Sequence, residues 1–131
     1  MTASNTHTQA SRELMERVYA SVAKGDGQAL LAAMSDDIII HEPPFLPYGG
    51  TYRGHKELAN LFAQIPKFVD VRKLKVDRLI ADGDHVIGIL RMPDLKTGEE
   101  LLVAEESIIR DGKIVEMYIY FHETRSLLPQ P

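Results

Sequence analysis

Residues 101–123 read LLVAEESIIRDGKIVEMYIYFHE, a stretch with the pattern of a β-hairpin. Asp111-Gly112 is a two-residue turn signal, because both residue types tolerate a positive φ angle. A turn of this length fixes the register, so Glu106 is expected opposite Met117. Side chains alternate along a strand, and the register therefore places a set of paired residues on one face. Around Glu106 and Met117 these pairs are Leu102 with Phe121, Ala104 with Ile119, and Ile108 with Val115.

Glu106 is the only carboxylate on that expected face. Burial of an unpaired carboxylate is costly, and such a group usually raises its pKa and keeps its proton. A proton held near neutral pH can serve acid–base chemistry or form a hydrogen bond to a ligand oxygen. The structural alternative is an ion pair with an arginine or a position at a wet sheet edge, and the sequence leaves both open.

Length and composition narrow the class of protein. The 131 residues suffice for one domain, and 44% hydrophobic with 26% charged residues is typical of a soluble globular chain. The net charge of −4 and the absence of a Lys/Arg cluster argue against nucleic acid and membrane as partners. The lack of cysteine excludes disulfides and thiol chemistry. With no apolar span and no signal-peptide pattern, a cytoplasmic protein is expected.

Three helices are predicted in the first half of the chain. The first, capped by Ser11 or Thr8 and ending at Gly25, follows a polar tail over residues 1–9 that is expected to be disordered. Asp26 is expected to cap a short second helix that runs through Met34. The apolar positions of the first helix are Leu14, Met15, Val18, Tyr19 and Val22, and those of the third, which ends before Pro66, are Leu58, Leu61, Phe62 and Ile65.

Strands dominate the rest. Residues 38–42 (IIIHE) form a β-branched strand that Pro43-Pro44 ends, and residues 45–54 form a loop rich in apolar groups. Further strands are expected from Leu74 to Ile80, over 85–92, and in the hairpin over 101–110 and 113–123. Three helices, one strand and a four-stranded antiparallel run predict the α+β class, with the helices on one face of a curved sheet.

This order resembles the SnoaL-like and ketosteroid-isomerase-like group of the nuclear transport factor 2-like superfamily. The residues that support the resemblance are Gly25-Asp26, Ser35-Asp36-Asp37, the run GTYRGH at 50–55 and the run DGKI at 111–114. It spans nearly the whole chain and implies one domain over residues 10–128. It also implies a cone-shaped α+β barrel whose strongly bent, mostly antiparallel sheet encloses an apolar pocket. Many members form dimers through the outer sheet face.

The resemblance implies roles for three residues. Steroid isomerases have a general base at the end of the first strand, directly before a proline, where this chain has Glu42-Pro43. Their second acid, which stays protonated and binds the oxyanion, corresponds to Glu106. SnoaL-like cyclases instead have an aspartate base that aligns with His122. In the expected register of the hairpin, His122 lies on the other face of the sheet from Glu106. Only a bulge after Tyr120 would turn His122 inward.

Substrate-binding candidates follow from the same comparison. Met117 and Phe121 correspond to a pocket methionine and a pocket aromatic residue. Val18 corresponds to a tyrosine donor on the first helix, and Tyr19 lies about 100° round the helix from it. Phe45 and Tyr48 are expected to form a lid over the pocket, and Phe62 belongs to the inner face of the third helix.

Two functions fit these observations. The first is a cofactor-independent enzyme of the isomerase or cyclase type, in which Glu42 moves a proton of an apolar carbonyl compound and protonated Glu106 stabilises the enolate. The alternative is a non-catalytic small-ligand-binding or dimerisation domain. Because His41, Glu42, His55 and His122 are scattered, neither a metal nor a cofactor is expected. The expected partners are a small apolar molecule and a second copy of the chain, which would bind the face of Tyr118 and Tyr120.

Overall fold

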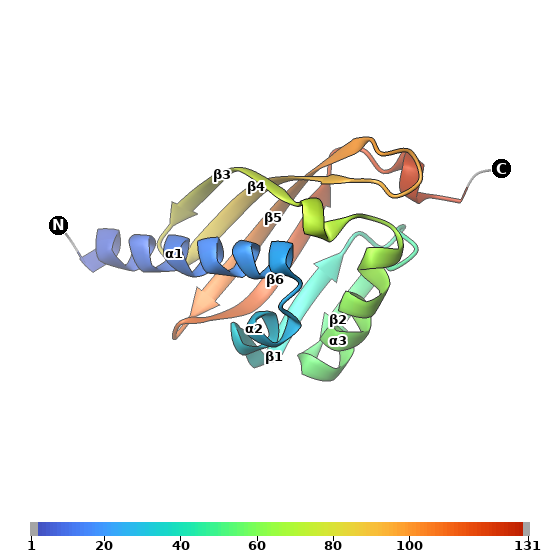
Figure 1. Cartoon of the computed structure of the whole chain (residues 1–131). Coiled ribbons are helices and arrows are strands. Elements are labelled where there is room, and N and C mark those ends of the chain that lie inside the picture. The colour runs from blue at the N-terminus through green and yellow to red at the C-terminus, as the bar shows by residue number, and fades with distance from the viewer. Residues whose placement is uncertain (1–2, 130–131) are drawn as a thin grey trace.

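Three helices pack on one face of a single bent six-stranded sheet (Figure 1). The structure, a computed structural model, describes residues 3–129. The helices are α1 (Ala3–Lys24), α2 (Gly27–Ala32) and α3 (Gly54–Gln64), with 3₁₀ turns η1 (Ile65–Lys67), η2 (Val71–Lys73) and η3 (Arg125–Leu127). The strands are β1 (Met34–Glu42), β2 (Gly50–Arg53), β3 (Lys75–Asp82), β4 (His85–Pro93), β5 (Glu100–Arg110) and β6 (Lys113–Phe121).

The strand order is β2-β1-β6-β5-β4-β3, and only β1 and β6 run parallel. The predicted α+β class with a bent, mostly antiparallel sheet is thus confirmed. Strand β2 was missed in the sequence because it is short and begins at a glycine with a φ of +112°. Since β1 joins the last strand, the end of β1 at Glu42 lies in the same sheet as the central strands β5 and β6.

Helix α1 begins earlier than predicted. The expected disordered tail over residues 1–9 is helical from Ala3 on, so Ser11 and Thr8 are not its caps, while Met1 and Thr2 lie outside the described residues. Thr8 instead accepts a hydrogen bond at its Oγ1 from the amide of Gly83 at 2.8 Å. This contact ties the first turns of the helix to the β3–β4 turn, which the apolar pattern alone could not indicate.

The connection from α1 to β1 follows the predicted chemistry in part. Gly25 ends α1 with a φ of +72°, and the Asp26 side chain accepts a hydrogen bond from the amide of Ala29, as a helix cap does. The second helix ends at Ala32, however, and not at Met34, which is already the first residue of β1. Backbone pairing of Met34 with Ile114 of β6 outweighs the local helical preference there.

The hairpin contains the predicted turn but not the predicted register. Asp111 and Gly112 have φ angles of +53° and +75°, and Ile109 pairs with Ile114 as expected. Beyond this point Val115 is an extra residue in β6, so Ile108 pairs with Glu116. The register predicted from Ile108 outward is therefore wrong, because a β-bulge inserts one unpaired residue.

This bulge exchanges the two faces of β5. Glu106 pairs with Tyr118 on the outer face, whereas Glu105 pairs with Ile119 on the inner face. Between Met34 and Ile39 the pairing of β1 with β6 also shifts, so the sheet is irregular on both sides of the bulge. Bulges bend strands and increase twist, which is how the sheet curves around the helices.

The hydrophobic core lies between the helices and the inner sheet face. Met15, Ile38, Leu58 and Ile114 are each completely buried there. In the described part of the chain, none of the helices combines the length and apolar character needed to cross a bilayer.

Gly88 on β4 leaves the space into which the Tyr19 ring fits, since an added Cβ would lie 2.6 Å from the Tyr19 hydroxyl oxygen. We expect Gly88→Ala to lower the free energy of unfolding by about 1–3 kcal/mol, because an overpacked core displaces its neighbours. Urea denaturation measures the change. Gly27→Ala is the control, since nothing lies within 4 Å of a Cβ there. Equal stability of the two variants would contradict this packing.

Candidate functional site

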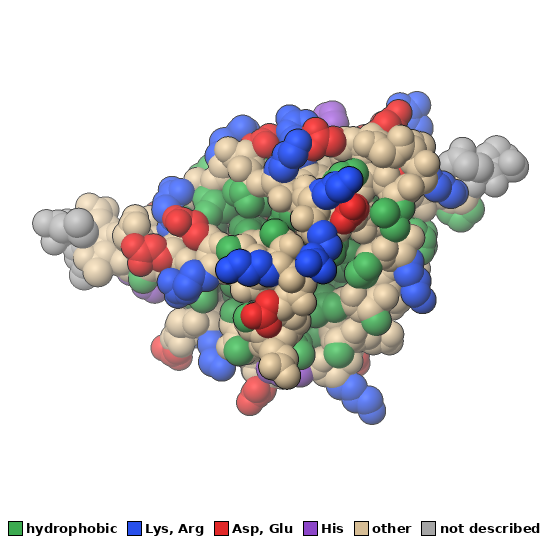
Figure 2. Space-filling model, viewed as in Figure 1, with side chains coloured by type: hydrophobic (Ala, Val, Ile, Leu, Met, Phe, Trp, Pro, Cys, Tyr) green, Lys and Arg blue, Asp and Glu red, His purple; other side chains and the backbone are tan. Residues whose placement is uncertain are grey.

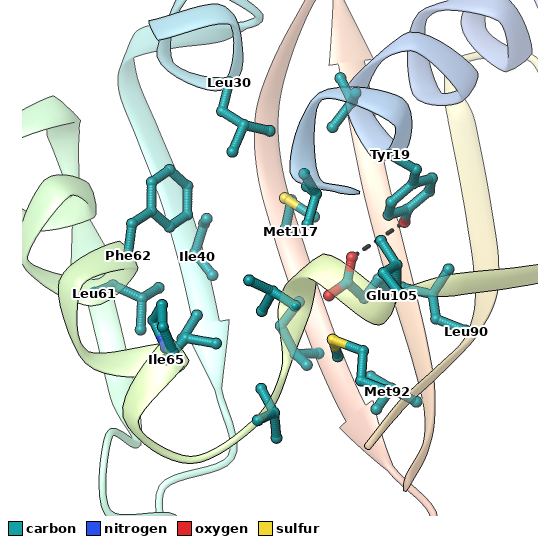
Figure 3. Close-up of a pocket in the computed structure, with 18 of the residues that line it drawn as sticks. Tyr19, Leu30, Ile40, Leu61, Phe62, Ile65, Leu90, Met92, Glu105 and Met117 are labelled. Atoms are coloured by element: carbon teal, nitrogen blue, oxygen red, sulfur yellow. Dashed lines mark hydrogen bonds between the residues drawn. The ribbon is translucent and has the colours of Figure 1, made fainter. Parts of the chain in front are cut away.

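A cavity of about 420 Å³ lies between the inner sheet face and the helices (Figure 3). Its walls are mostly apolar and come from α1, α2, α3, the segment from η1 to η2 and the strands β1, β4, β5 and β6. The lining residues include Leu30, Ile40, Leu61, Phe62, Ile65, Leu90, Met92, Val103, Met117 and Ile119. A cavity of this size and character suits a small apolar molecule.

Glu105 reaches the cavity from the middle of β5. Its Oε1 accepts a hydrogen bond from the hydroxyl of Tyr19 on α1 at 3.1 Å (Figure 3). Its neighbour across the ladder on β4 is Gly88, which has no side chain to block the tyrosine. Burial raises the pKa of Glu105 to about 7, although the hydrogen bond from Tyr19 favours the ionised form.

Glu42 reaches the same cavity from the end of β1. Its side chain is buried, and its Oε1 has no hydrogen-bond partner among the described residues. Burial, together with the smaller effect of the nearby charge of Glu105, raises the pKa of Glu42 to about 8. The expected position of Glu42 at the pocket agrees with the structure.

The two acids have no cation to neutralise them. Within residues 3–129 neither forms an ion pair, and Arg72 is the only lysine or arginine among the lining residues. Like charges that share a site of low dielectric cannot both ionise easily, so the proton leaves the pair in two steps. Between the two pKa values, about 7 for Glu105 and about 8 for Glu42, the pair therefore holds mainly one proton.

This arrangement can donate and accept a proton inside an apolar enclosure. The protonated acid can give a hydrogen bond to a carbonyl oxygen, while the carboxylate can remove a proton from the neighbouring carbon. Among the described residues there is no group of three or more His, Asp or Glu side chains that could hold a metal ion.

The structure brings most of the other candidates together. Val18, Tyr19, Tyr48, Phe62, Met117 and Phe121 all line the cavity. Phe45 does not: it is 60% exposed and lies outside the lining, so of the two residues expected to form a lid only Tyr48 lies at the cavity. His122 follows the end of β6, where it is exposed and also outside the lining.

Glu106 is the main correction. The expectation that it faces the pocket is wrong, because the bulge at Val115 turns it to the outer face. There its carboxylate lies 3.3 Å from Nδ1 of His85 and accepts a hydrogen bond from the Tyr120 hydroxyl at 3.4 Å.

Sequence reasoning missed Glu105 and Arg72. The signal for Glu105 was its position next to Glu106, since two adjacent glutamates on one strand must face opposite sides. A second signal was Gly88, whose buried strand position indicates a close approach by another group. Nothing in the local pattern around Arg72 pointed to the cavity.

Comparisons with known proteins agree with this geometry. A family model described as a SnoaL-like domain matches residues 15–117. A nuclear transport factor 2-like protein from Burkholderia xenovorans is similar in structure, with a TM-score of 0.74 and 24% identity over 92% of this chain and 94% of that one.

Two further solved structures bear names that concern ligands or activity. TerC, co-crystallised with polyporic acid, has a TM-score of 0.74 and 23% identity over 86% of this chain and 91% of its own. A candidate ketosteroid isomerase from Kribbella flavida has a TM-score of 0.75 and 18% identity over 95% and 84%. At these identities the likeness shows the fold alone.

No curated protein matches the sequence significantly. The family model nevertheless covers most of the chain. The chain belongs to the SnoaL-like domain family.

Proposed function

We propose that the protein is a cofactor-independent enzyme that moves a proton next to the carbonyl group of a small apolar compound. The observation that carries this proposal is a pair of buried acids, Glu42 and Glu105, in one apolar cavity without a cation beside them. The isomerase or cyclase type of reaction needs such a pair, because one group removes a proton while the other stabilises the enolate.

Hydrogen bonding supports an assignment of the two roles. The Tyr19 hydroxyl donates to Glu105, which stabilises its carboxylate form, whereas Glu42 Oε1 has no donor among the described residues. Glu105 is therefore the base, and Glu42 holds the proton that binds the carbonyl oxygen. The resemblance to steroid isomerases suggested that Glu42 is the base, so the proposed role of Glu42 is reversed. Glu105, and not Glu106, is the second acid of the pair.

The alternative is a binding domain without catalysis, which the size and apolar walls of the cavity also support. The two readings differ in whether the acids exchange a proton with the ligand carbon. Binding alone requires only that the cavity admits an apolar molecule, and it places no demand on the acids.

We further propose that two copies associate through the outer face of β1, β5 and β6. Tyr118 stacks on His41 with ring centroids 4.4 Å apart, and His41 Nε2 lies 2.6 Å from Glu116 Oε2. Tyr120 is 52% exposed on the same face. Exposed aromatic rings beside ordered polar groups are typical of protein interfaces.

Proton exchange tests the catalytic proposal. We expect the protein to accelerate deuterium exchange at the α-carbon of 1-tetralone, with the fastest rate near pH 7.5, between the pKa values of about 7 and about 8. Glu105→Gln and Glu42→Gln should each reduce the rate by about 100-fold or more. NMR follows the exchange.

Glu106→Gln is the matched control for this assay, because Glu106 is the neighbouring glutamate on the outer face. It should keep the wild-type rate. Tetralone binding without any acceleration of exchange would favour the binding domain over the enzyme.

The buried pair should also make stability depend on pH. Raised pKa values mean that the folded protein binds these protons more tightly than the unfolded chain, whose glutamates titrate near 4.5. The stabilisation is complete below that value and is lost as pH rises through about 7 and about 8, by at most about 1.4 kcal/mol per pH unit for each group.

Glu42→Gln should make this decline in the free energy of unfolding shallower, as measured by urea denaturation between pH 5 and 9, since an amide does not ionise and only Glu105 then titrates in the cavity. Glu106→Gln leaves both pocket acids in place and should keep the decline. A wild-type stability that is flat over this range would show that the pair is ionised in the folded protein.

Assembly can be tested directly. We expect analytical ultracentrifugation at micromolar concentration to give a species of twice the 14.7 kDa chain mass. Tyr120→Lys should shift the equilibrium toward the monomer, because it places a charge in the interface. Phe45→Lys, an exposed aromatic outside this face, should leave the dimer intact. A monomer in all three proteins would refute the proposal.

A further inference from the structure

Arg72 is the charged residue among the exposed lining residues of the cavity, within the part of the chain that the structure describes. Four of the lining residues are exposed to solvent and so mark where the cavity meets water: Gly25, Gly27, Pro66 and Arg72. They belong to the junction of α1 with α2 and to the segment from η1 to η2. Figure 2 shows hydrophobic side chains at the surface between α1 and α3, with Lys and Arg side chains nearby.

The guanidinium of Arg72 is held in place by the backbone. Its Nε donates to the carbonyl oxygen of Ala23 at 3.1 Å, in the last turn of α1. The negative end of the helix dipole favours a cation at this position. Gly25 provides the space, since an added Cβ there would lie 3.0 Å from Nη1 of Arg72.

The other nitrogens of this guanidinium are available. Among the described residues Nη1 and Nη2 have no hydrogen bond or ion pair, and the two nearby acids are engaged elsewhere. Asp26 accepts from the amide of Ala29, and Asp70 accepts from the amide of Arg72 itself. Two parallel N–H donors on a planar group match the geometry of a carboxylate.

Arg72 is also separate from the acid pair. It forms no ion pair with Glu42 or Glu105, and it does not contribute to the pKa shift of either acid. The cavity thus has a cation at its opening and two acids deeper in its apolar interior. A ligand that satisfies both the cation and the acids must combine an anionic group with a neutral, proton-exchanging carbonyl on an apolar body.

We propose that the substrate is an amphipathic keto acid whose carboxylate binds Arg72 while its apolar body and ketone occupy the cavity. This inference rests on the proposed function for the ketone end, but the binding of the carboxylate does not depend on catalysis.

A matched pair of probes tests the proposal: 4-(2-naphthyl)-4-oxobutanoate and its neutral methyl ester. Calorimetry at about pH 6 keeps both pocket acids protonated while the probe carboxylate is ionised. The wild-type protein should bind the acid about tenfold more tightly than the ester, and 0.5 M salt should reduce this preference. An ester that binds as tightly as the acid, or an acid that does not bind, overturns the proposal.

Arg72→Gln should weaken binding of the acid by about tenfold and leave the ester within about twofold. Lys73→Gln removes the same charge from the adjacent residue, which is exposed and outside the cavity lining, and should keep the preference. If Arg72 only fastens the end of α1, Arg72→Gln will weaken both probes equally, and the proposal fails. Should Arg72→Gln not fold, Arg72→Lys retains the charge but not the paired donors and should lose part of the preference.

The exchange assay separates this proposal from the proposed function. Preference for the acid probe without exchange at its α-carbon would refute the enzyme and leave the carboxylate site standing. Exchange without a preference for the acid would do the reverse.

Discussion

Val115, the unpaired residue of β6, sets the phase of the two central strands. Because of it, Ile114 and Met117 both face inward although they are three positions apart, and the inner face of β5 contains Glu105 instead of Glu106. The parallel strand β1 shifts its own pairing at the same level, so the irregularity extends across three strands. A sheet that bends here can surround a cavity with its own strands. A flat sheet would form only one wall, and the helices alone would have to form the others.

Two buried acids are costly, and the structure offsets this cost in two different ways. Glu105 accepts a hydrogen bond from the Tyr19 hydroxyl. This contact is possible because Gly88, the cross-strand neighbour of Glu105, leaves room for the tyrosine ring. Glu42 has no such donor among the described residues, and burial raises its pKa so that it keeps its proton at neutral pH. The asymmetry between the two acids thus originates in the packing of α1 against β4 and not in the acids themselves.

Local chemistry made much of this fold predictable. The Asp111-Gly112 turn, the Asp26 cap and the apolar face of α3 each depend on a few neighbouring residues, and each is present in the structure. The bulge could not be predicted in this way. It occurs where β6 also pairs with β1, a strand that is distant in sequence. An error of one residue reverses the faces of a strand, which is why Glu106 was expected where Glu105 lies. Glu42 was placed correctly since the Pro43-Pro44 stop is local.

The state of the two acids bears on the choice between an enzyme and a binding domain. A domain that only enclosed an apolar ligand would be more stable with an amide or an apolar side chain at these positions, because buried ionisable groups without partners destabilise the folded state. Within the described structure neither Glu42 nor Glu105 forms an ion pair that would offset the free-energy cost of burial, and neither caps a helix. Stability therefore gives no reason for a pair of acids here. The proposed proton transfer does, because it uses one protonated and one ionised acid in an apolar cavity.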